Sequence, residues 1–214
     1  MKEQNESACP FTIEVLGEGL ATAKPDETRV TLGVISEGEK LEELQAGNAA
    51  KIAAIVQALT ALGVARENIA TASFAIEPQY DYVDGKQVFR GYKATHLLQV
   101  TIAGTEAAGR IIDAAVANGA NTVTDVSFRS SMADEAQHDA LTLAVRNAQA
   151  KALAIADTLG VSLSAVPCKV EETQKTGFEP VQFKAAMPVG DAATTLEPGT
   201  LTFRAAVRVW YLYA

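Results

Sequence analysis

The sequence predicts an α+β fold, in which a largely antiparallel twisted sheet is covered by two long helices and one shorter helix. Three observations favour this class. Segments in which apolar and polar residues alternate outnumber segments with helical spacing. Tight turns separate several pairs of predicted strands, and only antiparallel neighbours can be joined so closely. The helical segments end at glycines and do not alternate regularly with single strands, so a doubly wound parallel sheet is not favoured.

The chain begins with two predicted strands, at residues 11–22 and 27–37. Apolar side chains alternate with polar ones in both. Between them, Pro25 presets the backbone angle that the second position of a turn needs, and Asp26 tolerates the next position. We therefore expect these two strands to pair with each other in antiparallel.

A long amphipathic helix and a hairpin follow. Apolar residues recur with helical spacing over residues 40–62, and Gly63 comes where a left-handed cap is expected. Alternation returns at 74–82 and 92–102, on either side of an Asp84-Gly85 turn. The sequence therefore predicts a hairpin with an aromatic tip.

The second half repeats these patterns. A shorter helix is predicted at 106–118, a strand at 123–128 and a second long helix at 133–159. The apolar stripe predicted for the second long helix consists of Leu141, Ala144, Val145, Ala148, Ala152, Ile155 and Leu159. Its many alanines would let it lie close on a sheet. Further strands are predicted at 166–170 and 201–213.

The organisation predicted is one domain over residues 11–214, preceded by residues 1–10 as a disordered segment or a remnant introduced for expression. Residues 173–199 show no period and are rich in Pro, Ala, Thr and Gly. Loops of this length within a domain are usually functional. We therefore expect this loop to be a contact element.

Charge and hydropathy exclude two classes of partner. The chain has 18 Lys and Arg against 26 Asp and Glu, a net charge of −8, so it lacks the cationic surface that binds nucleic-acid phosphates. The sequence contains no run of 18 or more apolar residues, which a transmembrane helix would require. The polar start fits either a cytosolic protein or one whose signal peptide has been removed.

The common catalytic signatures are missing. Gly17-Glu18-Gly19 resembles the start of a dinucleotide-binding motif, but Thr22 replaces the third glycine and a strand follows. There is no Gly-x-Ser-x-Gly, His-Glu-x-x-His or Walker sequence. We therefore predict no catalytic, cofactor-binding or metal-binding residues and no cofactor.

Two residue types leave alternatives open. His96 lies on the apolar side of its strand, where a packed, neutral, singly hydrogen-bonded ring is expected more than a general base. Cys9 and Cys168 each share the apolar parity of their strands. They either form a disulfide, if the strands are neighbours in an oxidising compartment, or remain two buried thiols.

Two aromatic groups are the predicted contacts of a homo-oligomer, because exposed aromatic residues supply interface area at low entropic cost. They comprise Tyr80, Tyr82, Phe89 and Tyr92 on the hairpin, and Trp210 and Tyr213 near the C-terminus.

Several short motifs together, in their order and spacing, resemble the SIMPL-domain family, which includes YggE-like and periplasmic immunogenic proteins. They are Ile13-Glu14-Val15-Leu16-Gly17-Glu18-Gly19, Lys24-Pro25-Asp26, Ala61-Leu62-Gly63-Val64, Thr71-Ala72-Ser73-Phe74, Pro78-Gln79-Tyr80-Asp81-Tyr82, Gly91-Tyr92, Gly119-Ala120-Asn121, Phe128 and residues 148–161. The chain departs from the family's pattern at His96, where a small polar residue is more usual.

The resemblance implies a SIMPL fold, export to the periplasm or cell envelope, ring-like oligomers and a link to defence against oxidative stress. It brings no catalytic residues. We expect a non-catalytic, self-assembling envelope protein. The alternatives are a small-ligand binder or unrecognised enzyme that uses His96 or the hairpin, and a thiol redox sensor that uses Cys9 and Cys168.

Overall fold

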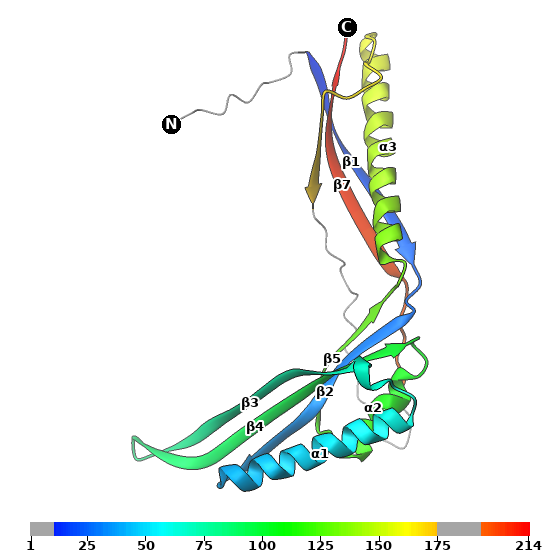
Figure 1. The fold of residues 1–214 in the computed structure, drawn as a ribbon. Coiled ribbons are helices and arrows are strands. Elements are labelled where there is room, and N and C mark those ends of the chain that lie inside the picture. The colour runs from blue at the N-terminus through cyan, green and yellow to red at the C-terminus, as the bar shows by residue number, and fades with distance from the viewer. Residues whose placement is uncertain (1–10, 175–193) are drawn as a thin grey trace. The chain divides into compact units, whose positions relative to one another are not determined.

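The computed structural model describes residues 11–174 and 194–214, and it confirms the α+β class. The elements, most of them labelled in Figure 1, are β1 (Thr12–Ala23), β2 (Glu27–Gly38), α1 (Leu41–Ala61), a 3₁₀ turn (Arg66–Asn68), β3 (Ile69–Val83), β4 (Lys86–Ala103), α2 (Ala108–Ala117), β5 (Thr122–Arg129), α3 (Ala133–Leu159), β6 (Lys169–Gln174) and β7 (Leu201–Leu212). The expectations for residues 1–10, and for the loop at 175–193, lie outside the described residues.

The strands form two antiparallel sheets, in the orders β1-β7-β6 and β3-β4-β2-β5. The chain divides accordingly into two compact units. Unit 1 contains β1, α3, β6 and β7, and unit 2 contains β2 to β5 with α1 and α2.

The predicted pairing of the first two strands is wrong, because β1 and β2 belong to different sheets. β1 pairs with β7 along its whole length, from Thr12 opposite Leu212 to Ala23 opposite Leu201. The backbone of Asp26 is already bonded within the sheet of β2, since its N–H donates to the Arg129 carbonyl at 2.9 Å. The segment around Pro25 therefore continues into a second sheet and does not reverse the chain.

Unit 2 has a core of aliphatic side chains between its sheet and helices α1 and α2. Val30, Leu32 and Val34 of β2 are fully buried there, with Ile55 and Leu59 of α1. In β2 these buried residues are every second one, and in α1 they are four residues apart. These are the spacings that place side chains on one face of a strand and of a helix. The predicted helix and core face are thus confirmed, although α1 leaves its terminal leucines exposed.

The hairpin and the helix end in unit 2 also follow the sequence. Asp84 and Gly85 have φ angles of 51° and 75°, which is the geometry of the tight turn that Asp-Gly favours. Gly63, with φ of 92°, follows the last turn of α1 as expected.

Helix α3 of unit 1 has the predicted bounds, and its predicted buried face is confirmed for Ala144, Ala148 and Ala152 but not for three larger residues of the stripe. Val145, Ile155 and Leu159 are exposed. The buried residues of α3 are all alanines: Ala136, Ala140, Ala144, Ala148, Ala152 and Ala156. The reason is the closeness of β1, since a Cβ placed on Gly17 would overlap the carbonyl oxygen of Ala144, and one on Gly19 would overlap that of Ala140.

Substitution of Gly17 by Ala tests this packing. We expect Gly17→Ala to lower the free energy of unfolding by about 1–3 kcal/mol or more, because the added methyl must push α3 away from β1. The measurement is urea unfolding followed by circular dichroism. Gly47→Ala in α1 is the control: no atom lies within 4 Å of its Cβ position, so this change should stabilise the helix by about 0.5–1 kcal/mol. Equal stability of Gly17→Ala and the unaltered protein would contradict the packing described.

Candidate functional site

The distal part of the β3–β4 hairpin carries a row of aromatic side chains on one face. Tyr80 lies opposite Phe89, and Tyr92 lies opposite Pro78. The Phe89 ring makes edge-on contacts with Tyr80, at 5.8 Å between centroids, and with Tyr92, at 5.1 Å. Tyr82 continues the row, because it has the same parity as Tyr80 in β3.

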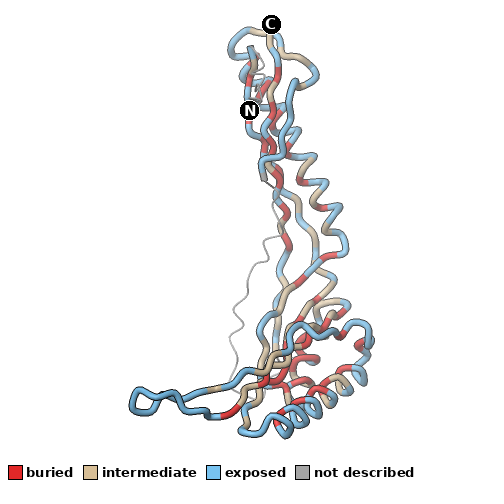
Figure 2. The backbone as a smooth tube through the Cα atoms, turned by 60° about the vertical axis from the view of Figure 1, so that its left-hand side comes forward, coloured by how far each residue is buried: buried red, intermediate tan, exposed pale blue. Residues whose placement is uncertain are grey.

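This aromatic row is an extension of the core face of the sheet. Tyr92 has the same parity in β4 as the buried residues Ala94, Leu98 and Val100. Helix α1 covers those residues but begins only after β2 has ended, and the hairpin runs on beyond it (Figure 1). The hairpin tip is consequently exposed (Figure 2).

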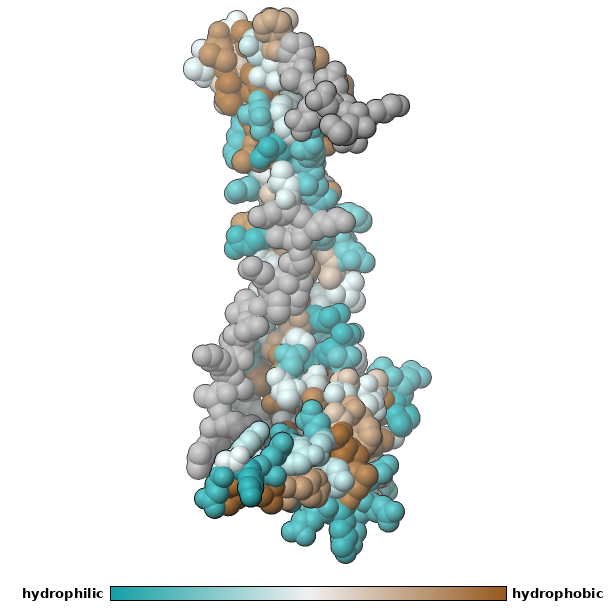
Figure 3. Space-filling model, turned by 90° about the vertical axis from the view of Figure 1, so that its left-hand side faces the viewer, coloured by the Kyte–Doolittle hydropathy of each residue, from teal (hydrophilic) through white to brown (hydrophobic). Residues whose placement is uncertain are grey.

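The exposed surface of the hairpin is more apolar than that of an ordinary loop. Tyr82 is 76% exposed and has no ring contact with another described residue. Tyr80, Val83, Val88 and Phe89 are also exposed. The view towards the hairpin end in Figure 3 shows apolar side chains next to hydrophilic ones in this unit.

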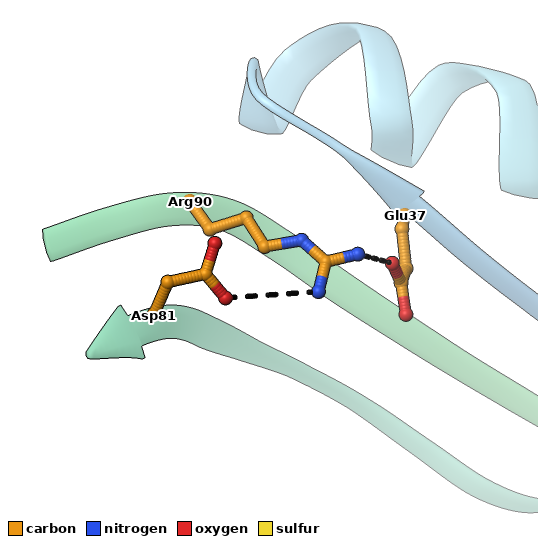
Figure 4. A network of polar contacts seen from close by, with 3 residues as sticks. All are labelled: Glu37, Asp81 and Arg90. Atoms are coloured by element: carbon orange, nitrogen blue, oxygen red, sulfur yellow. Dashed lines mark hydrogen bonds and ion pairs between the residues drawn. The ribbon is translucent and has the colours of Figure 1, made fainter. Parts of the chain in front are cut away.

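Charged residues brace the opposite face of the hairpin (Figure 4). Arg90 occupies a bulge in β4, and its guanidinium lies 3.1 Å from the Glu37 carboxylate and 3.9 Å from that of Asp81. Gly91, with φ of 147°, brings β4 against the carbonyl of Gly38. These contacts tie the base of the hairpin to the end of β2.

The second predicted aromatic group lies in unit 1, and its members have partners there. The Lys169 ammonium is 4.7 Å from the centre of the Trp210 ring, and Arg208 is 5.9 Å from it. Tyr213 contacts Phe11 edge-on at 6.4 Å. The six predicted contact residues thus form two separate groups, and the hairpin group is the more exposed one.

His96 is packed against an aromatic ring. It is half-buried, with its ring 5.0 Å from that of Phe74, and burial lowers its pKa from the usual 6.5. No hydrogen bond joins its ring to another described residue, so the expected single bond is not found. Over residues 11–174 and 194–214, no three His, Cys, Asp or Glu side chains are grouped so that they could hold a metal ion.

Cys168 does not face an apolar interior, and this prediction was wrong. It is exposed, as are Val166 and Val170 of the same parity. The reason is that α3 packs chiefly on β1 and β7 and leaves the β6 edge uncovered. Cys9 lies outside the described residues, so its pairing with Cys168 stays a prediction.

Several polar side chains, which were not identified from the sequence, form hydrogen bonds with the backbone of edge or terminal strand residues. The amide of Asn121 accepts a hydrogen bond from Ile35 N–H at 2.8 Å and donates one to the Ile35 carbonyl at 2.7 Å. On α3, Asn147 and Lys151 bond to the outer edge of β1. One feature of the sequence could have indicated these contacts: Asn147 and Lys151 are four residues apart, which places both on one side of α3 next to the alanine stripe.

Comparison with known proteins assigns the family. The SIMPL family model, described as a protein of unknown function (DUF541), matches residues 13–211. The chain therefore belongs to the SIMPL family.

Its relatives include envelope proteins. It is 29% identical over 170 residues to the 26 kDa periplasmic immunogenic protein of Brucella melitensis, an alignment that covers 77% of this chain and 68% of the relative. It is 26% identical over 200 residues to the uncharacterized protein YggE of Edwardsiella ictaluri, covering 90% and 83% of the two chains. The match to YggE of Escherichia coli K12 is 30% identical but covers 49% of this chain and 43% of that protein. No helix in the described parts of the chain is long and apolar enough to cross a membrane.

The lowered pKa of His96 predicts a pH dependence of stability. Because burial favours the neutral ring, the unfolded chain binds more protons than the folded protein as the pH falls below 6.5. The contribution of the neutral His96 ring to the free energy of unfolding is therefore fully present above pH 6.5. It is lost as the pH falls through the lowered pKa that His96 has in the folded protein. Urea midpoints should therefore fall with decreasing pH, and less steeply in His96→Gln than in the unaltered protein. An NMR titration that places the pKa of His96 at or above 6.5 would contradict this assignment.

Proposed function

We propose that this protein is a non-catalytic, self-assembling component of the bacterial cell envelope, and that the aromatic face of the β3–β4 hairpin is its assembly contact. The observation that carries the proposal is the aromatic row in which Tyr80, Tyr82 and Phe89 are exposed and Tyr92 is half-buried. Exposed aromatic clusters of this kind mark interaction surfaces, since burying them gives much contact area at low entropic cost.

The shape of the hairpin supports a contact with another chain. The row has core parity, yet α1 begins too late to cover it. The bracing of Arg90 by Glu37 and Asp81 gives the hairpin a defined direction before any contact forms. A rigid apolar surface of this kind loses little conformational entropy on binding.

The proposed location and role draw on the family. A relative is named as a periplasmic protein. The proposed role in defence against oxidative stress is what the resemblance of the sequence motifs to the SIMPL family implies. A protective role through assembly needs no cluster of reactive groups. The packing of His96 against Phe74 is in keeping with a structural ring rather than a general base, which needs an orienting partner.

Light scattering tests the assembly. We expect the native mass of the purified protein to be several times 22.5 kDa. Tyr82→Ser should lower that mass with little change in the thermal unfolding midpoint, because Tyr82 is 76% exposed and its ring contacts no other ring among the described residues. Val116→Ser in α2 is the control, since it removes an exposed apolar residue from another surface and should leave the mass unchanged. A monomer of the unaltered protein at micromolar concentration would contradict the proposal.

A further inference from the structure

The outer edge of β1 in unit 1 has backbone groups without a strand partner. β1 is at the end of the β1-β7-β6 sheet. Asn147 Oδ1 accepts from the N–H of Glu18 at 3.2 Å, and Lys151 Nζ donates to the carbonyl of Leu16 at 2.7 Å. Because backbone groups alternate in direction along an antiparallel strand, the N–H and C=O groups of Glu14, Leu16, Glu18 and Leu20 all point away from β7.

Only two of these outward groups are bonded within the described chain. Asn147 and Lys151 bond one group each, and they reach β1 from α3 as two polar side chains one helical turn apart. Both bonds are exposed to solvent. They occupy positions that a neighbouring strand would fill, and an incoming backbone can replace them at little cost.

A groove follows this edge. Its volume is about 1060 Å³, which is at or above the upper end of roughly 300–1,000 Å³ for small-molecule sites. The large apolar side chains of its lining are those of Leu16, Leu20 and Leu143, all more than 40% exposed. A second hollow, lined in part by Glu14, Leu16 and Ile155, continues along the same strand.

The charge of the groove is opposite to that of the whole chain. Four cations line it, namely Arg146, Lys151, Arg204 and Arg208, whereas the chain carries a net charge of −8. Among the described residues of the lining, Glu18 is the only acidic one. Glu14 of the adjoining hollow forms an ion pair with Arg208 at 3.4 Å and offsets part of the positive charge. Such a local reversal of sign attracts an acidic partner.

We propose that the edge of β1 accepts an extended peptide segment of another protein as an added antiparallel or parallel strand, and that this segment carries both apolar and acidic side chains. The backbone of the segment would bond to the outward groups of β1, as in other cases of strand addition. Leucine and cationic side chains occur together both on α3, as Leu143 and Arg146, and on β1 and β7, as Leu20 and Arg204. Both faces of an added strand would therefore meet apolar and positively charged side chains.

Binding of a defined peptide to the full chain tests the proposal. The probe is a fluorescein-labelled heptapeptide in which valine and glutamate alternate, and binding is followed by fluorescence anisotropy. We expect saturable binding that weakens as salt is added. A peptide with lysine in place of glutamate, and one methylated on alternate backbone nitrogens, should each bind at least about ten-fold more weakly. No saturable binding of the probe, or equal binding of either altered peptide, would overturn the proposal.

Substitutions in β1 and α3 distinguish pairing of the peptide with the edge of β1 from nonspecific binding. Leu16→Pro removes an outward N–H and leaves the β1–β7 hydrogen bonds intact, so it should abolish binding of the peptide. Leu16→Thr keeps that N–H, and its affinity for the peptide should be within a few-fold of that of the unaltered protein. Arg146→Glu lies outside the sheet and should weaken binding at least about ten-fold, which gives a second test should Leu16→Pro unfold. Unchanged binding by Arg146→Glu, or by folded Leu16→Pro, would overturn the proposal. Tyr82→Ser should bind the probe normally, so failure of this inference is distinct from failure of assembly through the hairpin.

Discussion

The close approach of α3 to β1 is the constraint on which unit 1 depends. Glycines at positions 17 and 19 remove two side chains from the strand, and an alanine at every fourth position of α3 fills the space that remains. A Cβ at either glycine would overlap the backbone of α3. At these positions the contact is made by backbone and methyl groups and gains its stability from many short van der Waals contacts. Larger side chains of the same sheet, among them Ile13, Val15 and Val207, are buried beside it.

This constraint also determines what lies beside it. Because the alanine face holds α3 at short distance, the next row of the helix, which includes Asn147 and Lys151, reaches the outer edge of β1. The long apolar residues of the helix remain at the surface for the same reason. The small residues of β1 and α3 therefore determine both the packing within unit 1 and which polar side chains lie at the outer edge of β1.

Much of the fold follows from local sequence patterns, but the pairing of distant strands does not. The bounds of α3 and the Asp84-Gly85 hairpin were predictable because helical spacing, alternation and turn residues act over a few neighbours. The β1–β7 pairing was missed because its residues are far apart in sequence, and a turn at Pro25 seemed sufficient. The buried face of α3 was predicted only in part: Ala144, Ala148 and Ala152 of the predicted stripe are buried, but its larger residues include three that the close approach to the glycines of β1 leaves at the surface. For the site, the sequence identified the aromatic residues of the hairpin, but it could not show that α1 begins too late to cover them, nor that side chains of α3 reach β1.

The order of elements along the chain has a consequence for biosynthesis. All strands and helices of unit 2 lie between β1 and α3 in the sequence, whereas β1 needs β7, whose Leu212 pairs with Thr12 at the opposite end of the chain. As the polypeptide leaves the ribosome, all strands and helices of unit 2 are made before β7, while β1 waits without its partner strand. A nascent chain of this protein therefore exposes a glycine-containing apolar strand until β7 emerges, and whatever keeps that strand from aggregating must act before then.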